Sequence, residues 1–249
     1  MMSLPAAAQV PVRHQEGTLH GFLALRDQSD KLLASGDLVQ VAQGDRITLR
    51  LAFHFKDGSL QEDTAIFTQH RTFHLISDHL VQKGPSFPHP LDLLIDTSKG
   101  LVTVRYTSDN HQEQVKSEHM NLPPDLANGM TPTLLKNIAQ NGDTKLSLVV
   151  ASPKPRIVKL AISAQGEDSF VVEGEEHKAM HFVVKIEPGG LAGVVAPLIG
   201  KQPPDMHVWV VGGKAPAFVK SEGQLYPDGP IWKIEIASPT WPKEKSGEQ

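Results

Sequence analysis

Histidine is the residue type in this sequence with the clearest capacity for chemistry, because imidazole binds metals and carries protons near neutral pH. The densest group is His70, His74 and His79, with His54 and His89 nearby. On one strand, His70 and His74 would share a face about 13 Å apart, at ~3.3 Å per residue. A metal ion needs nitrogens that converge at about 2.0–2.1 Å. We therefore expect no metal and no cofactor; a metal site would need His54 from a neighbouring strand beside His70 and His74.

Patterns for nucleophilic catalysis and for phosphate binding are absent from the sequence. The chain has no Gly-x-Ser-x-Gly elbow and no Gly-x-x-x-x-Gly-Lys-Ser/Thr loop. The Gly-rich stretch 189–193 has neither the spacing nor the βαβ context of a dinucleotide loop. Aspartate and glutamate occur throughout, so a pair of carboxyl groups from separate strands stays open as an acid–base site.

The run that we single out for function is Leu191–Ile199, an uncharged apolar segment with glycines on both sides. It is shorter than the ~20 residues that span a membrane. Its content of Gly and Pro argues against a regular strand. It is either a buried plug at one end of a sheet, or an apolar lip over a ligand cavity or a partner contact. The candidate contact residues are Leu191, Val194, Val195, Leu198, Ile199, Trp209 and Trp232.

Composition excludes several classes of site. The chain has no cysteine, which rules out disulfides, thiolate metal ligands and a thiol nucleophile. Its 24 Lys and Arg against 28 Asp and Glu give a net charge of −4. These charges are interspersed, so we expect no nucleic-acid partner. We also expect no transmembrane segment, because no apolar stretch approaches ~20 residues.

Strand patterns dominate the first half of the chain. Apolar and polar residues alternate over Ile47–Phe55, which predicts a half-buried strand. Asp57-Gly58 follows this strand and predicts a hairpin turn. Leu91–Ile95 and Leu101–Tyr106 flank a second predicted turn at 96–100.

One helix is predicted in the middle of the chain, over Thr131–Gln140. Thr131 would be its N-cap with Pro132 in the first position, and Asn141-Gly142 would stop it. Strands then resume, and the last three form a closing antiparallel meander. The predicted strands are 145–150, 156–164, 169–173, 178–187, 206–211, 216–220 and 231–237.

These elements predict a mainly β protein with one short central helix. The sheet would be a single curved antiparallel β-sheet, an open barrel or a sandwich. We expect one β-rich domain over residues 17–238, a flexible leader over 1–16 and a flexible charged tail over 239–249. Ala6-Ala7-Ala8 in the leader is typical of the end of an export signal.

The arrangement resembles an exported bacterial family, domain of unknown function 3108. The resemblance rests on the Pro-containing break and helix at Leu122–Ile138, the Trp-bearing strand His207–Val210 and the Pro-led strand Ala215–Lys220. It spans residues 17 to 238. It implies a periplasmic or envelope location and a curved sheet loosely like the half-barrels of lipoprotein carriers, and it brings no catalytic residues.

We therefore expect a periplasmic or envelope protein that binds an apolar ligand or peptide on a concave sheet. Its partner would be a lipid, another apolar small molecule or an envelope protein. The alternative is a hydrolase or lyase acting on a sugar or ester, with a site of His and carboxylates from several strands. A third reading is a structural interaction module. An apolar cavity would favour the first reading, and a cleft with His and acids of shifted pKa would favour the second.

Overall fold

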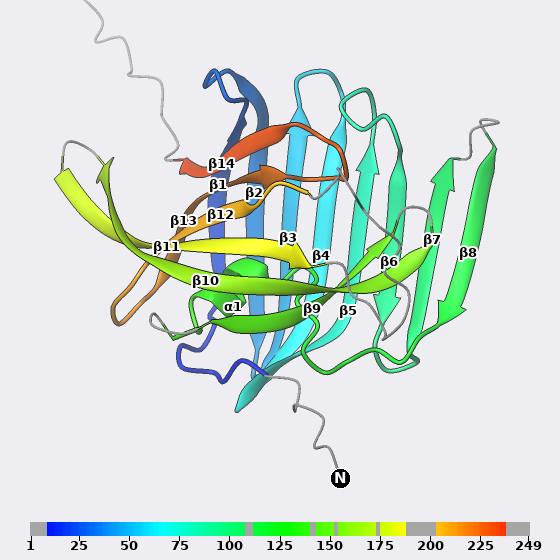
Figure 1. Ribbon diagram of the computed structural model, residues 1–249, viewed down its shortest axis with the longest axis horizontal. Helices are drawn as coiled ribbons and strands as arrows, with labels where there is room; N and C mark the ends of the chain where they lie inside the picture. The colour runs from blue at the N-terminus through cyan, green and yellow to red at the C-terminus, as the bar shows by residue number, and fades with distance from the viewer. Residues whose placement is uncertain are drawn as a thin grey trace, which may run out of the picture.

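The expectation of a mainly β protein is confirmed. In the computed structural model, the described residues form one open antiparallel sheet of fourteen strands and a single short α-helix (Figure 1). The structure describes residues 9–107, 112–139, 143–151, 154–172, 175–187 and 203–237. None of the helical residues in these ranges belongs to a helix long and apolar enough to cross a membrane.

The sheet consists of two meanders joined along one seam. The first contains β1 (Leu19–Arg26), β2 (Leu32–Gln43), β3 (Arg46–Phe55), β4 (Leu60–His70), β5 (Thr72–Lys83), β6 (Leu91–Asp96), β7 (Leu101–Thr107) and β8 (Glu113–His119). The second contains β9 (Thr144–Ala151), β10 (Pro155–Val172), β11 (Glu175–Glu187), β12 (Met206–Val211), β13 (Ala217–Gln224) and β14 (Ile231–Ala237). The seam pairs β1 with β14, with Leu25 opposite Ile234. Helix α1 (Thr131–Leu135) lies between the meanders in sequence.

Both predicted hairpins are confirmed. The turn between β3 and β4 contains Gly58 at φ 84°, a backbone conformation that favours glycine. Asp57 supports the turn, because its Oδ1 accepts a hydrogen bond from the backbone N–H of Ser59 at 2.9 Å. The turn between β6 and β7 ends at Gly100, with φ 60°.

Two predicted elements are corrected by the structure. The strands expected over 156–164 and 169–173 are one strand, β10, because Gly166 at φ 109° absorbs a bulge without breaking the pairing with β11. Helix α1 is shorter than expected. Its N-cap is Met130 rather than Thr131.

The early end of α1 has a visible cause in Asn137. Its side-chain amide donates to the carbonyl of Thr133 at 2.9 Å, where an α-helix would use the backbone N–H of the same residue. The backbone N–H of Asn137 donates instead to the carbonyl of Leu134, three residues earlier, as in a 3₁₀ turn. The stop expected at Asn141-Gly142 lies outside the described residues.

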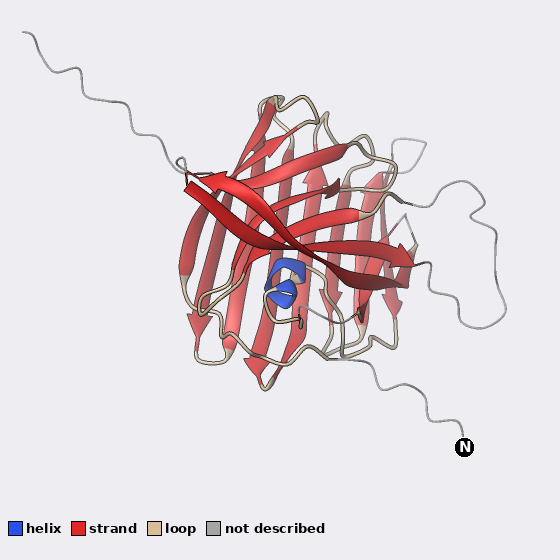
Figure 2. Ribbon diagram, turned by 60° about the vertical axis from the view of Figure 1, so that its left-hand side comes forward, coloured by secondary structure: helices blue, strands red, loops and turns tan. Residues whose placement is uncertain are grey.

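The second meander crosses over the first, and α1 sits beside the crossing (Figures 1 and 2). One continuous core joins the two meanders and the helix. It includes Phe67 from β4, Phe182 from β11 and Leu135 from α1, each at most 2% exposed. Burying a side chain of this kind contributes roughly 1.5–3 kcal/mol, so the crossing is held mainly by apolar contact.

The segment before β1 packs against the sheet instead of extending from it. The carbonyl of Val10 accepts from the N–H of Phe73 at 3.1 Å, and the N–H of Val12 donates to Arg71 at 2.8 Å. Glu16 is buried. Residues 9–16, expected in a flexible leader, are therefore part of the packed structure. Residues 1–8 and the tail from 238 lie outside the described residues.

Candidate ligand-binding site

An apolar chamber of about 350 Å³ lies between the first strands of the chain and the last. Aliphatic and aromatic side chains from both meanders dominate its wall. They include Leu23, Leu38, Leu49, Val208, Phe218 and Ile234. Gly21 on β1 helps to leave the space open, since a Cβ added there would meet nothing closer than Leu38 Cβ at 3.9 Å. The chamber has the size and lining of a small-molecule site.

Trp232 is the one predicted contact residue in the described ranges that reaches the chamber. It is 5% exposed. Its ring packs against Phe55, Phe87 and Tyr226 with centroids 5.4–6.0 Å apart. Trp232 therefore both fills the core and forms part of the chamber wall.

Trp209 lies elsewhere, on the side of β12 away from the buried Val208 and Val210. Its indole stacks on His181 at 4.5 Å and donates to Asp168 Oδ2 at 2.8 Å. The structure therefore does not bring Trp209 and Trp232 together. The other predicted contact residues, Leu191, Val194, Val195, Leu198 and Ile199, lie outside the described residues.

The three histidines considered for a metal are separated. His70 ends β4, and Arg71 at φ 62° turns the chain before His74 on β5, so the assumption of one shared strand was wrong. His70 contacts Asp45 at 3.1 Å and His74 contacts Thr72 at 2.8 Å. His54 is exposed at the far end of the β3–β4 hairpin. Within the described ranges, no three His, Asp or Glu side chains are placed to hold a metal ion.

The sequence left open a pair of carboxyl groups from separate strands without identifying its members, and the structure places such a pair at the chamber. Asp63 on β4 forms part of the chamber wall, and Asp78 on β5 lies behind it, 2% exposed. Neither buried Oδ1 atom accepts a hydrogen bond from an N–H or hydroxyl group of the described residues. The two carboxyl groups interact at close range, which disfavours ionisation of both and favours a proton on one of them.

Burial shifts the pKa of both groups upward. It raises the pKa of Asp63. It raises the pKa of Asp78 well above its usual value, and the neighbouring Asp63 adds to that shift. The signal that could have found the pair is the inward position of Asp63 on β4, where alternation otherwise places Ala65 and Phe67. Strand register brings Asp78 close to Asp63, because Asp78 on β5 lies opposite Ala65 on β4.

Gly129 closes the chamber wall over this pair. It adopts φ 64°. A Cβ added there would lie 2.4 Å from Asp78 Oδ1, 2.6 Å from Ala65 Cβ and 3.4 Å from Asp63 Oδ1. Only glycine fits this approach without displacing its neighbours.

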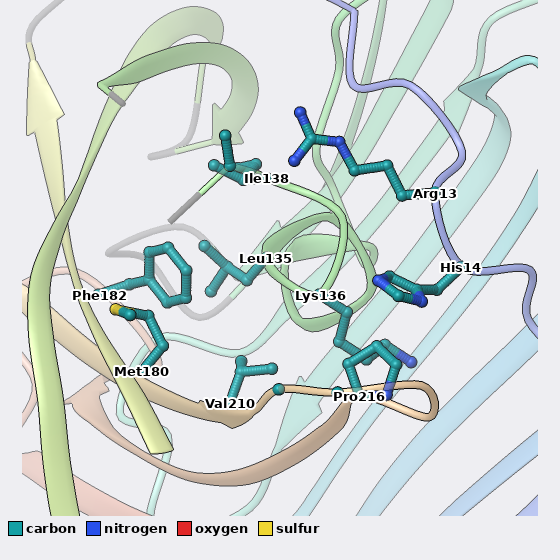
Figure 3. A pocket seen from close by; sticks show the side chains of 12 residues that line it. Arg13, His14, Leu135, Lys136, Ile138, Met180, Phe182, Val210 and Pro216 are labelled. Carbon is teal, nitrogen blue, oxygen red and sulfur yellow. The ribbon is translucent and has the colours of Figure 1, made fainter. Parts of the chain in front are cut away.

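A second hollow, which we call the cleft, adjoins the chamber and has a volume of about 530 Å³. Arg13 and His14 face the apolar side chains of Phe182 and Val210 across it (Figure 3). Lys136 and Pro216 line both the cleft and the chamber. The two hollows therefore meet beside α1.

A buried ion pair fixes the boundary between the cleft and the chamber. Lys136 Nζ lies 2.6 Å from Glu16 Oε1, with side chains 12% and 5% exposed. Gln40 donates a further hydrogen bond to Glu16 Oε2 at 3.0 Å. The segment before β1 is thus tied to both α1 and β2.

No protein-family model and no curated protein matches the chain, so membership of domain of unknown function 3108 is not supported. The chain is similar to the solved structure of a beta-barrel-like protein of domain of unknown function DUF1849 from Brucella abortus. The two chains are 10% identical with a TM-score of 0.46, over 93% of this chain and 98% of that one. The geometry of the chamber and the cleft therefore carries the functional proposal.

Proposed function

We propose that the protein binds an apolar small molecule in the chamber between its two meanders. The observation that carries the proposal is an unfilled space of about 350 Å³ with a mostly apolar wall. Protein interiors pack at a density of about 0.74 and leave few voids larger than a water molecule. An apolar space of this size is typical of a site that a ligand fills.

The proposed location is the periplasm or cell envelope. The export-like pattern of Ala6-Ala7-Ala8 supports it. Fractionation of cells expressing the natural gene tests it. We expect processed protein in the envelope fraction, and unprocessed protein recovered only in the cytoplasm would contradict the location but not the ligand site.

The ligand site is tested by filling the chamber from Gly21. A Gly21→Phe variant places a ring in space that is open in the wild type. We expect the uncharged dye Nile red to bind the wild type saturably, and the variant at least about ten-fold more weakly. Gly17→Leu is the matched control, because Gly17 is exposed, has nothing within 4 Å of an added Cβ and does not line the chamber.

Equal binding of Nile red by wild type and Gly21→Phe would place the dye elsewhere and contradict the proposal. Melting temperatures of all three proteins are compared first, so that loss of binding is not confused with loss of folding. Native mass spectrometry of the wild type with dodecanol supplies a second readout of stoichiometry.

A second candidate function is the hydrolase of a sugar or ester, favoured by the Asp63–Asp78 pair. Two carboxyl groups that share a proton at a cavity wall supply an acid and a base together. Turnover of p-nitrophenyl esters and glycosides by the wild type, lost in Asp78→Asn, would support this function. Turnover that Asp78→Asn leaves intact would exclude the pair as its site.

A further inference from the structure

We infer that the ligand is an anionic amphiphile: its chain occupies the chamber, and its carboxylate or phosphate head lies in the cleft beside Arg13. This inference rests on the proposed function and names the class of its ligand. The structural basis is the meeting of an apolar chamber with a cleft that carries unpaired positive charge.

The positive charge in the cleft comes from Arg13. Its guanidinium forms no ion pair or side-chain hydrogen bond with another residue of the described ranges. Lys136 is different, since its charge is taken up by Glu16 at 2.6 Å. Arg13 therefore remains available to an anion, and a guanidinium binds a carboxylate or phosphate through two parallel hydrogen bonds.

The backbone that carries Arg13 is held in place. Asn137, which is fully buried, accepts hydrogen bonds through its Oδ1 from the backbone N–H groups of Arg13 at 2.9 Å and His14 at 2.8 Å. These two bonds tie the segment before β1 to the end of α1. They hold both side chains at the edge of the cleft (Figure 3).

The opposite wall of the cleft is apolar. Phe182 and Met180 come from β11 and Val210 from β12, with Leu135 and Ile138 between them and the cationic side (Figure 3). A ligand here would meet charge on one side and hydrocarbon on the other. That combination favours a molecule with both an anionic head and an alkyl chain over a free anion or a plain hydrocarbon.

The alkyl chain of such a ligand has a route from its head group in the cleft to the chamber. Lys136 and Pro216 border both hollows. Because Lys136 is paired with Glu16, this border carries no unpaired charge of its own. An alkyl chain that leaves the head at Arg13 can therefore continue past Pro216 into the apolar chamber.

The test is displacement of Nile red by ligands that differ only in their heads. Dodecanoate, dodecyl phosphate and dodecanol are titrated against wild type, Arg13→Gln and Arg46→Gln. Arg46 is the matched control, an exposed arginine that lines neither hollow. We expect the wild type to bind both anions about five-fold or more tighter than dodecanol. This preference should vanish in Arg13→Gln, persist in Arg46→Gln and weaken in high salt.

The outcomes separate this inference from the proposed function. Equal binding of dodecanol and dodecanoate by the wild type would overturn the anionic head and leave the chamber intact. No displacement by any of the three would overturn the chamber as well. Inorganic phosphate as potent as dodecyl phosphate would show a free-anion site and overturn the amphiphile. An anion preference unchanged in Arg13→Gln would remove Arg13 from the site.

Discussion

At the scale of single residues, the pair formed by Asp63 at the chamber wall and the buried Asp78 is the feature that departs most from ordinary β-sheet chemistry. Two carboxyl groups face each other at the wall of an apolar chamber, and burial raises the pKa of both. The folded protein therefore retains a proton that the unfolded chain releases above about pH 4. The contribution of the pair to stability is full below that pH and is lost as the pH rises towards the folded pKa.

Asp78→Asn should reduce this pH dependence. An amide at position 78 keeps the shape and can donate a hydrogen bond to Asp63 without a shared proton. Over a measured range of about pH 4 to 8, we expect the unfolding free energy of the wild type to fall as the pH rises, by up to ~1.4 kcal/mol per pH unit. Asp78→Asn should show a flatter profile and greater stability at pH 8, measured by urea denaturation across this range.

Asp96 is the control for that measurement, because its pKa is shifted in the opposite direction. Hydrogen bonds from Ser98 and Lys99 lower the pKa of Asp96 to about 2. Its stabilising contribution is present above the unfolded pKa and is lost as the pH falls through the folded pKa. Asp96→Asn should therefore lower stability at neutral pH. A wild-type profile that rises between pH 4 and 8 and is unchanged by Asp78→Asn would refute the shared proton.

Gly129→Ala tests the close approach over the same pair. The new methyl group would lie 2.4 Å from Asp78 Oδ1 on a backbone at φ 64°. We expect a loss of about 3 kcal/mol or more of unfolding free energy. Gly44→Ala, at φ 60° with nothing within 4 Å of the Cβ, should cost only about 1 kcal/mol. Similar losses of unfolding free energy in the two variants would mean that the neighbours of Gly129 can move aside at little energetic cost.

At the scale of elements, most strands follow from alternation and turn chemistry, and the exceptions have specific causes. Ile231–Ala237 was predicted with the bounds of β14. The sequence predicts a break between the strands 156–164 and 169–173, but glycine also accommodates a bulge, and Gly166 does so inside the long strand β10. The turn at Arg71 could not be predicted, because nothing in this residue type indicates a φ of 62°. That turn separates His70 from His74.

The site was less predictable than the strands. The chamber depends on β1 meeting β14, a pairing across most of the chain that local patterns do not encode. Asp63 and Asp78 become neighbours through strand register and a bulge near Phe67. Glu16 was expected in a flexible leader, but it is buried, and its partner Lys136 lies 120 residues away.

Lys136→Met tests how the segment before β1 is held. Removing the ammonium leaves Glu16 buried without its partner, which typically costs about 3–5 kcal/mol. Urea denaturation should show this loss, and hydrogen exchange should show faster exchange at Val12, whose N–H bonds to Arg71. The double variant Glu16→Gln with Lys136→Met should recover most of the stability. A single variant as stable as the wild type would show that Glu16 reaches solvent or takes up a proton at little cost.

At the scale of the whole molecule, the seam and the chamber belong together. In the sheet, the two meanders are hydrogen-bonded to each other through β1 and β14, which come from opposite ends of the chain. The chamber lies beside that seam. Phe218 and Ile234 line it from the second meander, and Leu23 and Leu49 from the first. A ligand in the chamber would therefore contact both meanders at once and stabilise their association.

Ligand binding should consequently protect the seam in particular. At a free ligand concentration of 100 times Kd, the folded state gains about 2.7 kcal/mol, so dodecanol should raise the melting temperature of the wild type. Hydrogen exchange should slow most at the β1–β14 pairs, such as Leu23 with Ile236, and least at the outer strand β8. Gly21→Phe should show neither effect, because its added ring occupies the chamber. Slower exchange at β8, with unchanged exchange at the β1–β14 pairs, would place the ligand away from the chamber, since a ligand at β8 does not contact β1 or β14.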